Sequence, residues 1–107
     1  MRGILFALAL VVVAFPAWAQ LSDQMMDDLG EQCAWADSYP ARVNACTKVI
    51  ESGQESEEET GDDYMHRGVA FEQMGLRAQA IADYRRAMQL DRYLDLTENL
   101  QRLGATP

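Results

Sequence analysis

The sequence of 107 residues predicts an all-α fold built from helical hairpins, and three observations support this prediction. Residues 61–94 contain two amphipathic patterns of helical period, separated by Gly75. Residues 23–50 repeat the pattern of residues 61–88 at a constant offset of 38, with no gap in the comparison. The third observation is a set of leucines at the spacing of one short helical face: Leu96, Leu100 and Leu103.

The clearest hairpin is expected in residues 61–94. Asp62 and Asp63 suit a helix N-terminus, because the positive end of the helix dipole attracts negatively charged side chains. The apolar faces of its two helices contain Tyr64, Gly68, Phe71 and Met74 in the first, and Ala80, Ile81, Tyr84, Ala87 and Met88 in the second. Glycine inside a helix is less favourable than alanine by about 1 kcal/mol. Gly68 therefore predicts that a neighbouring backbone comes close.

The spacing of these residues resembles the tetratricopeptide repeat, whose pattern combines aromatic, leucine-glycine, alanine and proline positions. The matching residues are Tyr64, Arg67-Gly68, Phe71, Ala80, Tyr84 and Ala87. Arg67 stands where the family has leucine, and Arg92 stands where it has proline. The resemblance implies two helix-turn-helix repeats, stacked as antiparallel helix pairs, with a C-terminal capping helix that covers the last apolar face.

The first repeat is a degenerate copy of the second. The offset of 38 places Leu29-Gly30 on Arg67-Gly68, and Cys33 and Cys46 on Phe71 and Tyr84. Arg42 replaces the small residue Ala80, so this copy is expected to pack less closely. Pro40 suits the first turn of its second helix, where a missing N–H is harmless.

The predicted boundaries are a signal peptide at 1–19 and a repeat domain at 20–107, with repeat 1 at about 23–56, repeat 2 at about 61–94 and the capping helix at about 95–104. Residues 51–60 are rich in acidic side chains and predict a solvated loop. Residues 95–98 come close to a capping box for the final helix. The sequence leaves open whether this helix is separate from the preceding one or continues it.

The N-terminus predicts export. Arg2 precedes an apolar run of twelve residues, Ile4 to Phe15, and Ala17-Trp18-Ala19 forms a small-residue cleavage site. A run of twelve is shorter than the roughly 20 residues that span a bilayer. We therefore expect cleavage after Ala19, no membrane insertion afterwards, and a secreted protein. Resemblance to small exported repeat proteins implies the bacterial periplasm.

The composition is acidic, with 17 acidic and 9 basic side chains and a formal charge of −8. Removal of residues 1–19 removes Arg2, so the remaining chain has 8 basic against 17 acidic side chains, a charge of −9. This balance argues against nucleic acid and anionic membrane surfaces as partners, since both select for basic patches. It favours a protein or peptide partner that is basic or apolar.

Cys33 and Cys46 are the only cysteines, and an exported protein carries them into an oxidising compartment. Their places in the repeat imply that they face each other between paired helices, so a structural disulfide is expected. A redox role is disfavoured because catalytic dithiols usually sit as Cys-x-x-Cys. With a single histidine, a cage of cysteine and histidine ligands for zinc cannot be assembled. The acidic stretch lacks the alternating ligands of an EF-hand, so no metal site is expected there.

The sequence suggests binding rather than catalysis. His66 follows Asp62 and Asp63, but no activated nucleophile, phosphate loop or metal constellation completes a catalytic site, and no cofactor is expected. By resemblance, the first helices line a concave groove, which would be acidic here, and its residues are Asp27, Asp28, Glu31, Trp35, Met65, His66, Val69, Glu72 and Gln73.

The expected function is therefore a non-enzymatic protein-interaction module. Trp35 either anchors the partner or packs on the turn that follows it. One alternative is a self-associating structural protein that forms a homodimer through its final leucine-bearing helix. Another is a small enzyme or enzyme inhibitor that uses His66. The sequence names neither the partner, nor the pathway, nor the organism.

Overall fold

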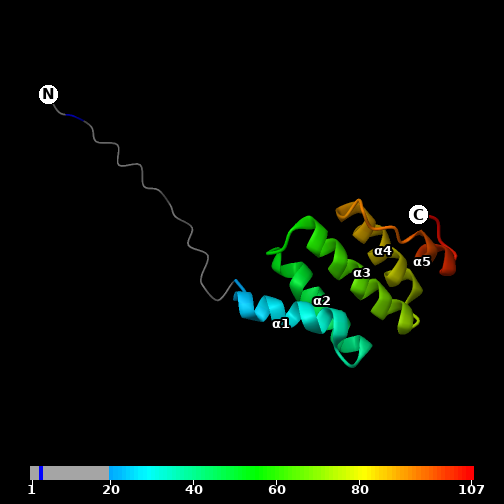
Figure 1. Ribbon diagram of the computed structural model, residues 1–107, viewed down its shortest axis with the longest axis horizontal. Helices are drawn as coiled ribbons and strands as arrows, with labels where there is room; N and C mark the ends of the chain where they lie inside the picture. The colour runs from blue at the N-terminus through cyan, green and yellow to red at the C-terminus, as the bar shows by residue number, and fades with distance from the viewer. Residues whose placement is uncertain (1–2, 4–19) are drawn as a thin grey trace.

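The computed structural model describes Gly3 and residues 20–107, and the predicted signal peptide therefore lies, apart from Gly3, outside the described residues. All regular structure in the described part is helical (Figure 1). Its five helices are α1 (Asp23–Trp35), α2 (Tyr39–Ser52), α3 (Glu57–Gln73), α4 (Arg77–Leu90) and α5 (Thr97–Arg102). None of the helices in this part of the chain has the length and apolar character needed to cross a membrane.

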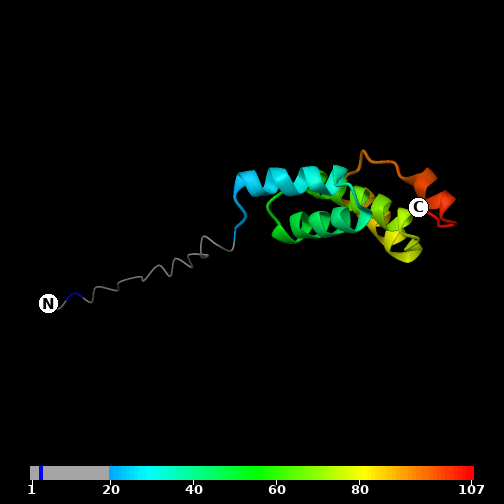
Figure 2. The same ribbon diagram turned by 90° about the horizontal axis from the view of Figure 1, so that it is seen from below.

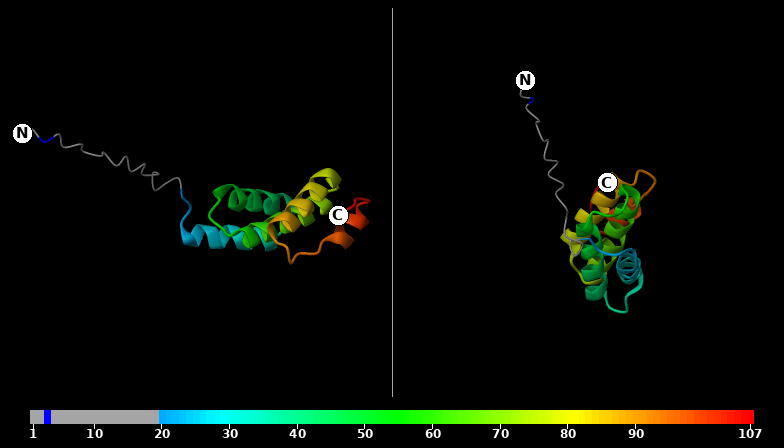
Figure 3. Two further views of the ribbon diagram at one scale, coloured as in Figure 1. Left: turned by 90° about the horizontal axis from the view of Figure 1, so that it is seen from above. Right: turned by 90° about the vertical axis from the view of Figure 1, so that its left-hand side faces the viewer.

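The helices form two neighbouring hairpins and a short final helix. α1 packs on α2, α3 packs on both α2 and α4, and α1 also touches α3. Figure 2 shows α1 and α2 running alongside each other as the first hairpin. Figure 3 shows α5 at the end of the molecule opposite the start of α1, next to α4. The predicted all-α class is confirmed, and the arrangement is repeat-like.

Serine side chains begin the first three helices. Ser22, Ser38 and Ser56 each accept a hydrogen bond from the backbone N–H three residues later. Such caps satisfy one of the N–H groups that a helix start leaves without a partner. Gly53 and Gly75 follow α2 and α3 with φ of 64° and 75°, a left-handed conformation that glycine adopts without strain.

The predicted solvated loop at residues 51–60 is wrong. α2 continues to Ser52 and α3 already begins at Glu57, so only residues 53–56 connect them. The reason is a capping box: Ser56 caps the N–H of Glu59, and Glu59 accepts a hydrogen bond from the N–H of Ser56. Asp63 consequently lies inside α3, where it is buried, and not at a helix N-terminus.

The final helix is separate from α4, which settles the question that the sequence left open. α4 ends at Leu90, and α5 starts at Thr97 without a side-chain cap. The expected capping box is absent from this helix; instead the carboxylate of Asp95 accepts a hydrogen bond of 3.0 Å from the N–H of Thr97. Leu96 and Leu100 are buried in the same cluster as the apolar residues of α4.

Tyr84 is the largest fully buried side chain of the described residues, and it packs against Gly68. A Cβ atom on Gly68 would lie 2.8 Å from the Cδ1 and Cε1 atoms of the Tyr84 ring, far inside van der Waals contact. The expected close approach is confirmed, but the neighbour is an aromatic ring and not a backbone. The Tyr84 hydroxyl donates a hydrogen bond of 2.9 Å to Glu72 on α3.

The disulfide between Cys33 and Cys46 is confirmed, with an S–S distance of 2.03 Å. It joins α1 to α2, and both cysteines are fully buried in a small core with Ala45, flanked by Leu29 and Ile50. The first hairpin thus uses a covalent bond at the positions where the second hairpin uses Phe71 and Tyr84.

Arg67 connects three helices. From α3, its guanidinium donates two hydrogen bonds of 2.8 and 2.9 Å to the carboxylate of Asp83 on α4. It donates a third, of 3.1 Å, to the Thr47 hydroxyl on α2. The planar guanidinium suits such a two-pronged contact, which a leucine at this position could not make.

We expect Gly68→Ala to destabilise the protein by about 1–3 kcal/mol, because the added methyl group would overlap the Tyr84 ring. Gly30→Ala is the matched control. Gly30 lies inside α1, and apart from its chain neighbours and the backbone of its own helix no atom of the described residues is within 4 Å of the position of a Cβ, so alanine should stabilise the helix by about 0.5–1 kcal/mol. Urea unfolding followed by circular dichroism measures both changes. Equal effects of the two substitutions would contradict the proposed overlap.

We expect the double substitution of Cys33 and Cys46 by alanine to lower the free energy of unfolding by about 3 kcal/mol, because a crosslink over a loop of this size restricts the unfolded chain. In a domain of this size the melting temperature should fall by roughly 10 °C or more. Thermal unfolding under non-reducing conditions tests the prediction. An unchanged melting temperature would show that the disulfide contributes nothing to stability.

Candidate functional site

Three of the predicted groove residues lie together on α1. Asp28, Glu31 and Trp35 line a pocket of about 240 Å³, whose remaining walls are Gln32 and Ala36. We call it the tryptophan pocket. The Trp35 side chain is 73 % exposed, so it does not pack into the protein core. Two carboxylates and an exposed indole therefore share one small surface.

Trp35 also touches α3. Its ring centroid lies 6.4 Å from that of His66, with the two planes tilted by 56°. Burial lowers the pKa of His66, the nearby Asp62 opposes this shift, and Arg42 adds to it. Since burial and Arg42 both favour the uncharged imidazole, His66 presents mainly a flat, uncharged ring to Trp35 at neutral pH.

Of the other predicted groove residues of α3, two pack against the core, one pairs with an arginine of α5 and one is exposed. Met65 and Val69 are half-buried against the core cluster that includes Leu100. Glu72 accepts two hydrogen bonds of 2.9 Å from Arg102 on α5, and the hydrogen bond from Arg102 lowers the pKa of Glu72. Gln73 is exposed at the last position of α3. These four predicted groove residues do not join the tryptophan pocket.

Asp27 belongs to a second pocket, which we call the acidic pocket. It has a volume of about 260 Å³ and lies where the start of α1 meets the α2–α3 turn and the first turn of α3. Its walls contain four carboxylates, with Met26 and Gln54 between them: Asp23, Asp27, Glu55 and Glu59. No basic side chain of the described residues lines it.

Asp63 lies next to this pocket, beside Glu55. The side chain is 7 % exposed, and burial, the adjacent Glu55 carboxyl and the charges of Asp62 and Glu59 raise the pKa of Asp63 to about 8. Among the described residues, no donor reaches Asp63 Oδ2 or Glu55 Oε2. With a pKa of about 8, the Asp63 carboxyl holds its proton at neutral pH.

The Asp63 carboxyl also lies against the disulfide. Its Oδ1 atom is 3.5 Å from Cys33 Sγ. A disulfide sulfur carries no proton, so this contact supplies no hydrogen bond to the carboxyl group. The apolar neighbour explains why burial is the largest cause of the raised pKa.

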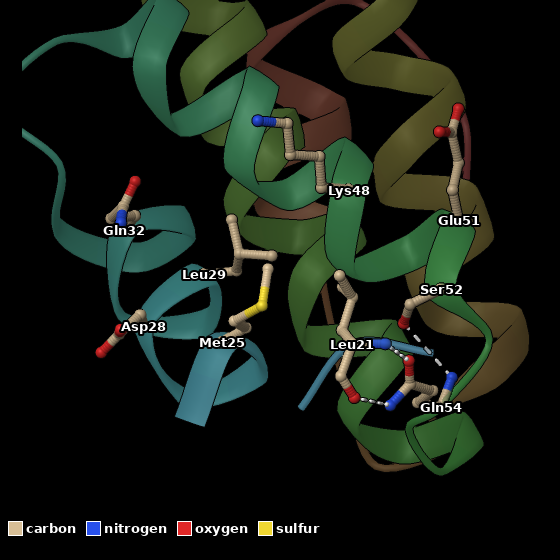
Figure 4. A pocket seen from close by; sticks show the side chains of 9 residues that line it. All are labelled: Leu21, Met25, Asp28, Leu29, Gln32, Lys48, Glu51, Ser52 and Gln54. Carbon is tan, nitrogen blue, oxygen red and sulfur yellow. Dashed lines mark hydrogen bonds between the residues drawn. The ribbon is translucent and has the colours of Figure 1, made fainter. Parts of the chain in front are cut away.

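A third and larger hollow, the hairpin cleft, lies between α1 and α2 and has a volume of about 600 Å³. In Figure 4, Met25 and Leu29 point from α1 toward α2, and Leu21 lies beside them. Leu21 is held by Gln54, which accepts a hydrogen bond from its N–H and donates one to its carbonyl oxygen, each of 2.9 Å (Figure 4). The cleft has apolar walls with polar residues around them: Asp28, Gln32, Lys48, Glu51, Ser52 and Gln54.

No group of three or more histidine, cysteine, aspartate or glutamate side chains in the described part of the chain has the arrangement of a metal site. Of the carboxylates of the acidic pocket, Glu59 accepts hydrogen bonds of 2.8 and 2.9 Å from the hydroxyl and the N–H of Ser56. Glu55, Glu59 and Asp63, which follow one another at intervals of four residues, do come together.

Comparisons with models of known protein families, with curated proteins and with solved structures found no match to this chain.

Sequence reasoning misses the acidic pocket and the hairpin cleft for different reasons. The acidic composition places Glu55 and Glu59 in a solvated loop, although the Ser56 and Glu59 spacing of a capping box is present in the sequence. The hairpin cleft exists because α1 and α2 are separated along one side of the first hairpin, and the spacing of apolar residues in the sequence does not reveal the distance between two helices. Its one sequence signal is the unmatched apolar pair Met25 and Leu29.

We expect stability to fall as the pH rises toward 8, with a contribution from Asp63 of roughly 1 kcal/mol per pH unit. The pKa of Asp63 is about 8 in the folded protein, against 3.8 for an unperturbed aspartate, so the folded state binds the extra proton between these values. The stabilisation is complete below about pH 4. It is lost as the pH passes through the folded pKa.

Asp63→Asn should remove this pH dependence, because an amide keeps the shape and the neutral state of the protonated acid. Urea unfolding of both proteins at pH 5, 7 and 9 measures the difference. Asp62→Asn, at the exposed neighbouring position, is the control and should keep most of the dependence. Parallel pH curves for the parent and Asp63→Asn would contradict the assignment of the proton to Asp63.

Proposed function

We propose that this chain is an exported, non-enzymatic protein-interaction module of two tetratricopeptide repeats with a capping helix, and that it binds a basic partner segment on the acidic face of α1. Two helical hairpins related by a sequence offset of 38, followed by α5, support the repeat assignment. The binding function is supported by the surface around Trp35.

The observation that carries the proposal is the exposure of Trp35 beside two carboxylates. A tryptophan that is 73 % exposed contributes little to the core, and exposed aromatic residues are common anchors in protein interfaces. Asp28 and Glu31 lie in the same pocket, and His66 contacts the indole ring. The surface therefore combines a flat apolar anchor with negative charge.

This combination suits an arginine or lysine side chain of the partner. A cation over the face of tryptophan gains about 0.5–2 kcal/mol, depending on how far it is removed from water. The carboxylates of Asp28 and Glu31 can pair with the same charge. The charge of −9 that remains after cleavage, from 8 basic and 17 acidic side chains, attracts a basic segment from a distance and repels acidic ones.

Export to the bacterial periplasm is part of the proposal. The N-terminal pattern of Arg2, an apolar run and Ala17-Trp18-Ala19 supports cleavage after Ala19. The disulfide between Cys33 and Cys46 is in keeping with an oxidising compartment, where such bonds persist.

We expect a basic peptide, such as acetylated hexa-arginine, to change the fluorescence of Trp35 on binding. Trp35 is the only tryptophan in residues 20–107, so after cleavage the signal reports this side chain alone. Trp35→Ala should weaken binding about tenfold or more, as measured by calorimetry, because truncating an interface anchor typically removes over 1 kcal/mol. Affinity should also fall as salt screens the carboxylates.

Tyr93→Ala is the matched control. Tyr93 is 72 % exposed, but it lies beside its neighbour Arg92, whose guanidinium is 4.9 Å from the ring centroid. Its removal should leave the affinity unchanged. If hexa-arginine produced no change at Trp35, or if both substitutions weakened binding equally, the proposed surface would be wrong.

Self-association is a second candidate, and the exposed apolar side of the hairpin cleft is the observation that favours it. A dimer through the leucines of the final helix is disfavoured, because Leu96 and Leu100 are buried within the same chain. Met25 is 50 % exposed at the cleft and can meet a second copy. The cleft is also the side of the first hairpin that α3 does not cover.

Sedimentation at increasing concentration tests this candidate. A dimer through the hairpin cleft should dissociate in Met25→Glu, because a charge would then be buried in an apolar interface. Trp35→Ala should leave such a dimer intact. A monomer at all concentrations would exclude self-association as the function.

A further inference from the structure

The face that α1 presents in the hairpin cleft has the same register as a face of α3. Four residues of α1 line the cleft: Met25, Asp28, Leu29 and Gln32. The sequence offset of 38 places them on four residues of α3: Asp63, His66, Arg67 and Ala70. Because the two hairpins repeat one pattern without a gap, positions of equal register lie on equivalent faces of the two helices.

In the second hairpin this face is covered by other helices. At three of the four positions the contacting group belongs to α1 or α2: the Cys33 sulfur for Asp63, the Trp35 ring for His66 and the Thr47 hydroxyl for Arg67. The fourth residue, Ala70, is fully buried. The face is therefore one on which a neighbouring pair of helices packs.

In the first hairpin the equivalent face is open. α3 packs on the other side of α1 and α2, and α4 and α5 make no contact with them within the described part of the chain. Met25 is 50 % exposed, and Figure 4 shows it beside Leu29 in the hollow of about 600 Å³. An apolar groove between two helices, with polar residues around it, is suited to the apolar face of an amphipathic helix.

The hairpin cleft is continuous with the tryptophan pocket. Asp28 and Gln32 line both hollows. Met25 and Trp35 are ten residues apart on one helix, which is roughly 15 Å at the rise of an α-helix. A partner helix of about three turns therefore reaches from the apolar walls of the cleft to the exposed indole.

We propose that the partner segment is an amphipathic helix, whose apolar side chains fill the hairpin cleft while a basic residue of the same helix reaches Trp35 and Asp28. The inference rests on the proposed function for the basic character of the partner. It adds the secondary structure of the partner and a second contact surface, at the opposite end of α1 from Trp35.

Charge favours a basic helix over a second copy of the chain as the occupant. The charged residues that line the cleft are two acids and one base: Asp28, Glu51 and Lys48. A second copy would carry the same charge of −9, from 8 basic and 17 acidic side chains, so the two chains repel each other, whereas a basic helix is attracted. The flexible thioether of Met25 can adapt to the shape of an inserted side chain.

Calorimetry with three acetylated peptides tests the inference. The helix peptide has about 15 residues, with leucines at intervals of three and four along one face and as many arginines as hexa-arginine on the other. The reordered peptide has the same composition without an apolar stripe, and the third is hexa-arginine itself. We expect the helix peptide to bind about tenfold or more tightly than the other two, because burying one leucine side chain is worth at least that factor.

Met25→Gln should weaken the binding of the helix peptide about three- to tenfold, because the amide is then buried against apolar side chains. It leaves the charge unchanged, so hexa-arginine should bind as it does to the parent protein. Met74→Gln is the matched control, since Met74 is 39 % exposed at the end of α3 and does not line the cleft. Circular dichroism establishes that each variant is folded. Equal affinity of the helix peptide for the parent and Met25→Gln would overturn the inference.

The remaining outcomes separate this inference from the proposed function. If hexa-arginine bound at Trp35 and the helix peptide bound no more tightly, the binding function would stand and the role of the cleft would be overturned. No binding of any peptide would overturn both. Equally tight binding of the reordered peptide would overturn the helical form of the partner. A dimer in sedimentation that Met25→Gln dissociates would assign the cleft to a second copy, against the inference.

Discussion

The close contact between Gly68 and the ring of Tyr84 organises the second half of the molecule. It lets α3 and α4 approach until the ring is fully buried. The Tyr84 hydroxyl then reaches Glu72, and Glu72 in turn pairs with Arg102 of α5. The absence of a methyl group at Gly68 thus permits a continuous set of contacts from the hairpin to the final helix.

The two hairpins solve the same packing problem with different chemistry. The second fills the space between its helices with Phe71 and Tyr84, whereas the first has Cys33 and Cys46 at these positions and closes the gap with a covalent bond. A small core gains little from apolar burial alone, so a crosslink is an effective substitute. Arg67 holds the hairpins together through Asp83 and Thr47.

The acidic side chains of this protein are not equivalent. The first turn of α3 contains Glu57, Glu58 and Glu59, and their negative charges interact favourably with the positive end of the helix dipole. Asp83 and Glu72 are paired with arginines. Around the start of α1 the carboxylates have no such partners among the described residues, and the protein neutralises part of this charge by keeping a proton on Asp63.

Local spacing and a single pair of cysteines were enough to predict the helical class, the two hairpins, the close approach at Gly68 and the disulfide. The same reasoning misjudged the start of α3, since the capping box of Ser56 and Glu59 outweighed the acidic composition of the segment. Two features emerged only from the folded arrangement: Glu72 pairs with Arg102, and Asp63 lies near Glu55 beside the disulfide. Such contacts depend on the relative placement of helices, and a pattern within one helix holds no information about the charges that another helix brings near it.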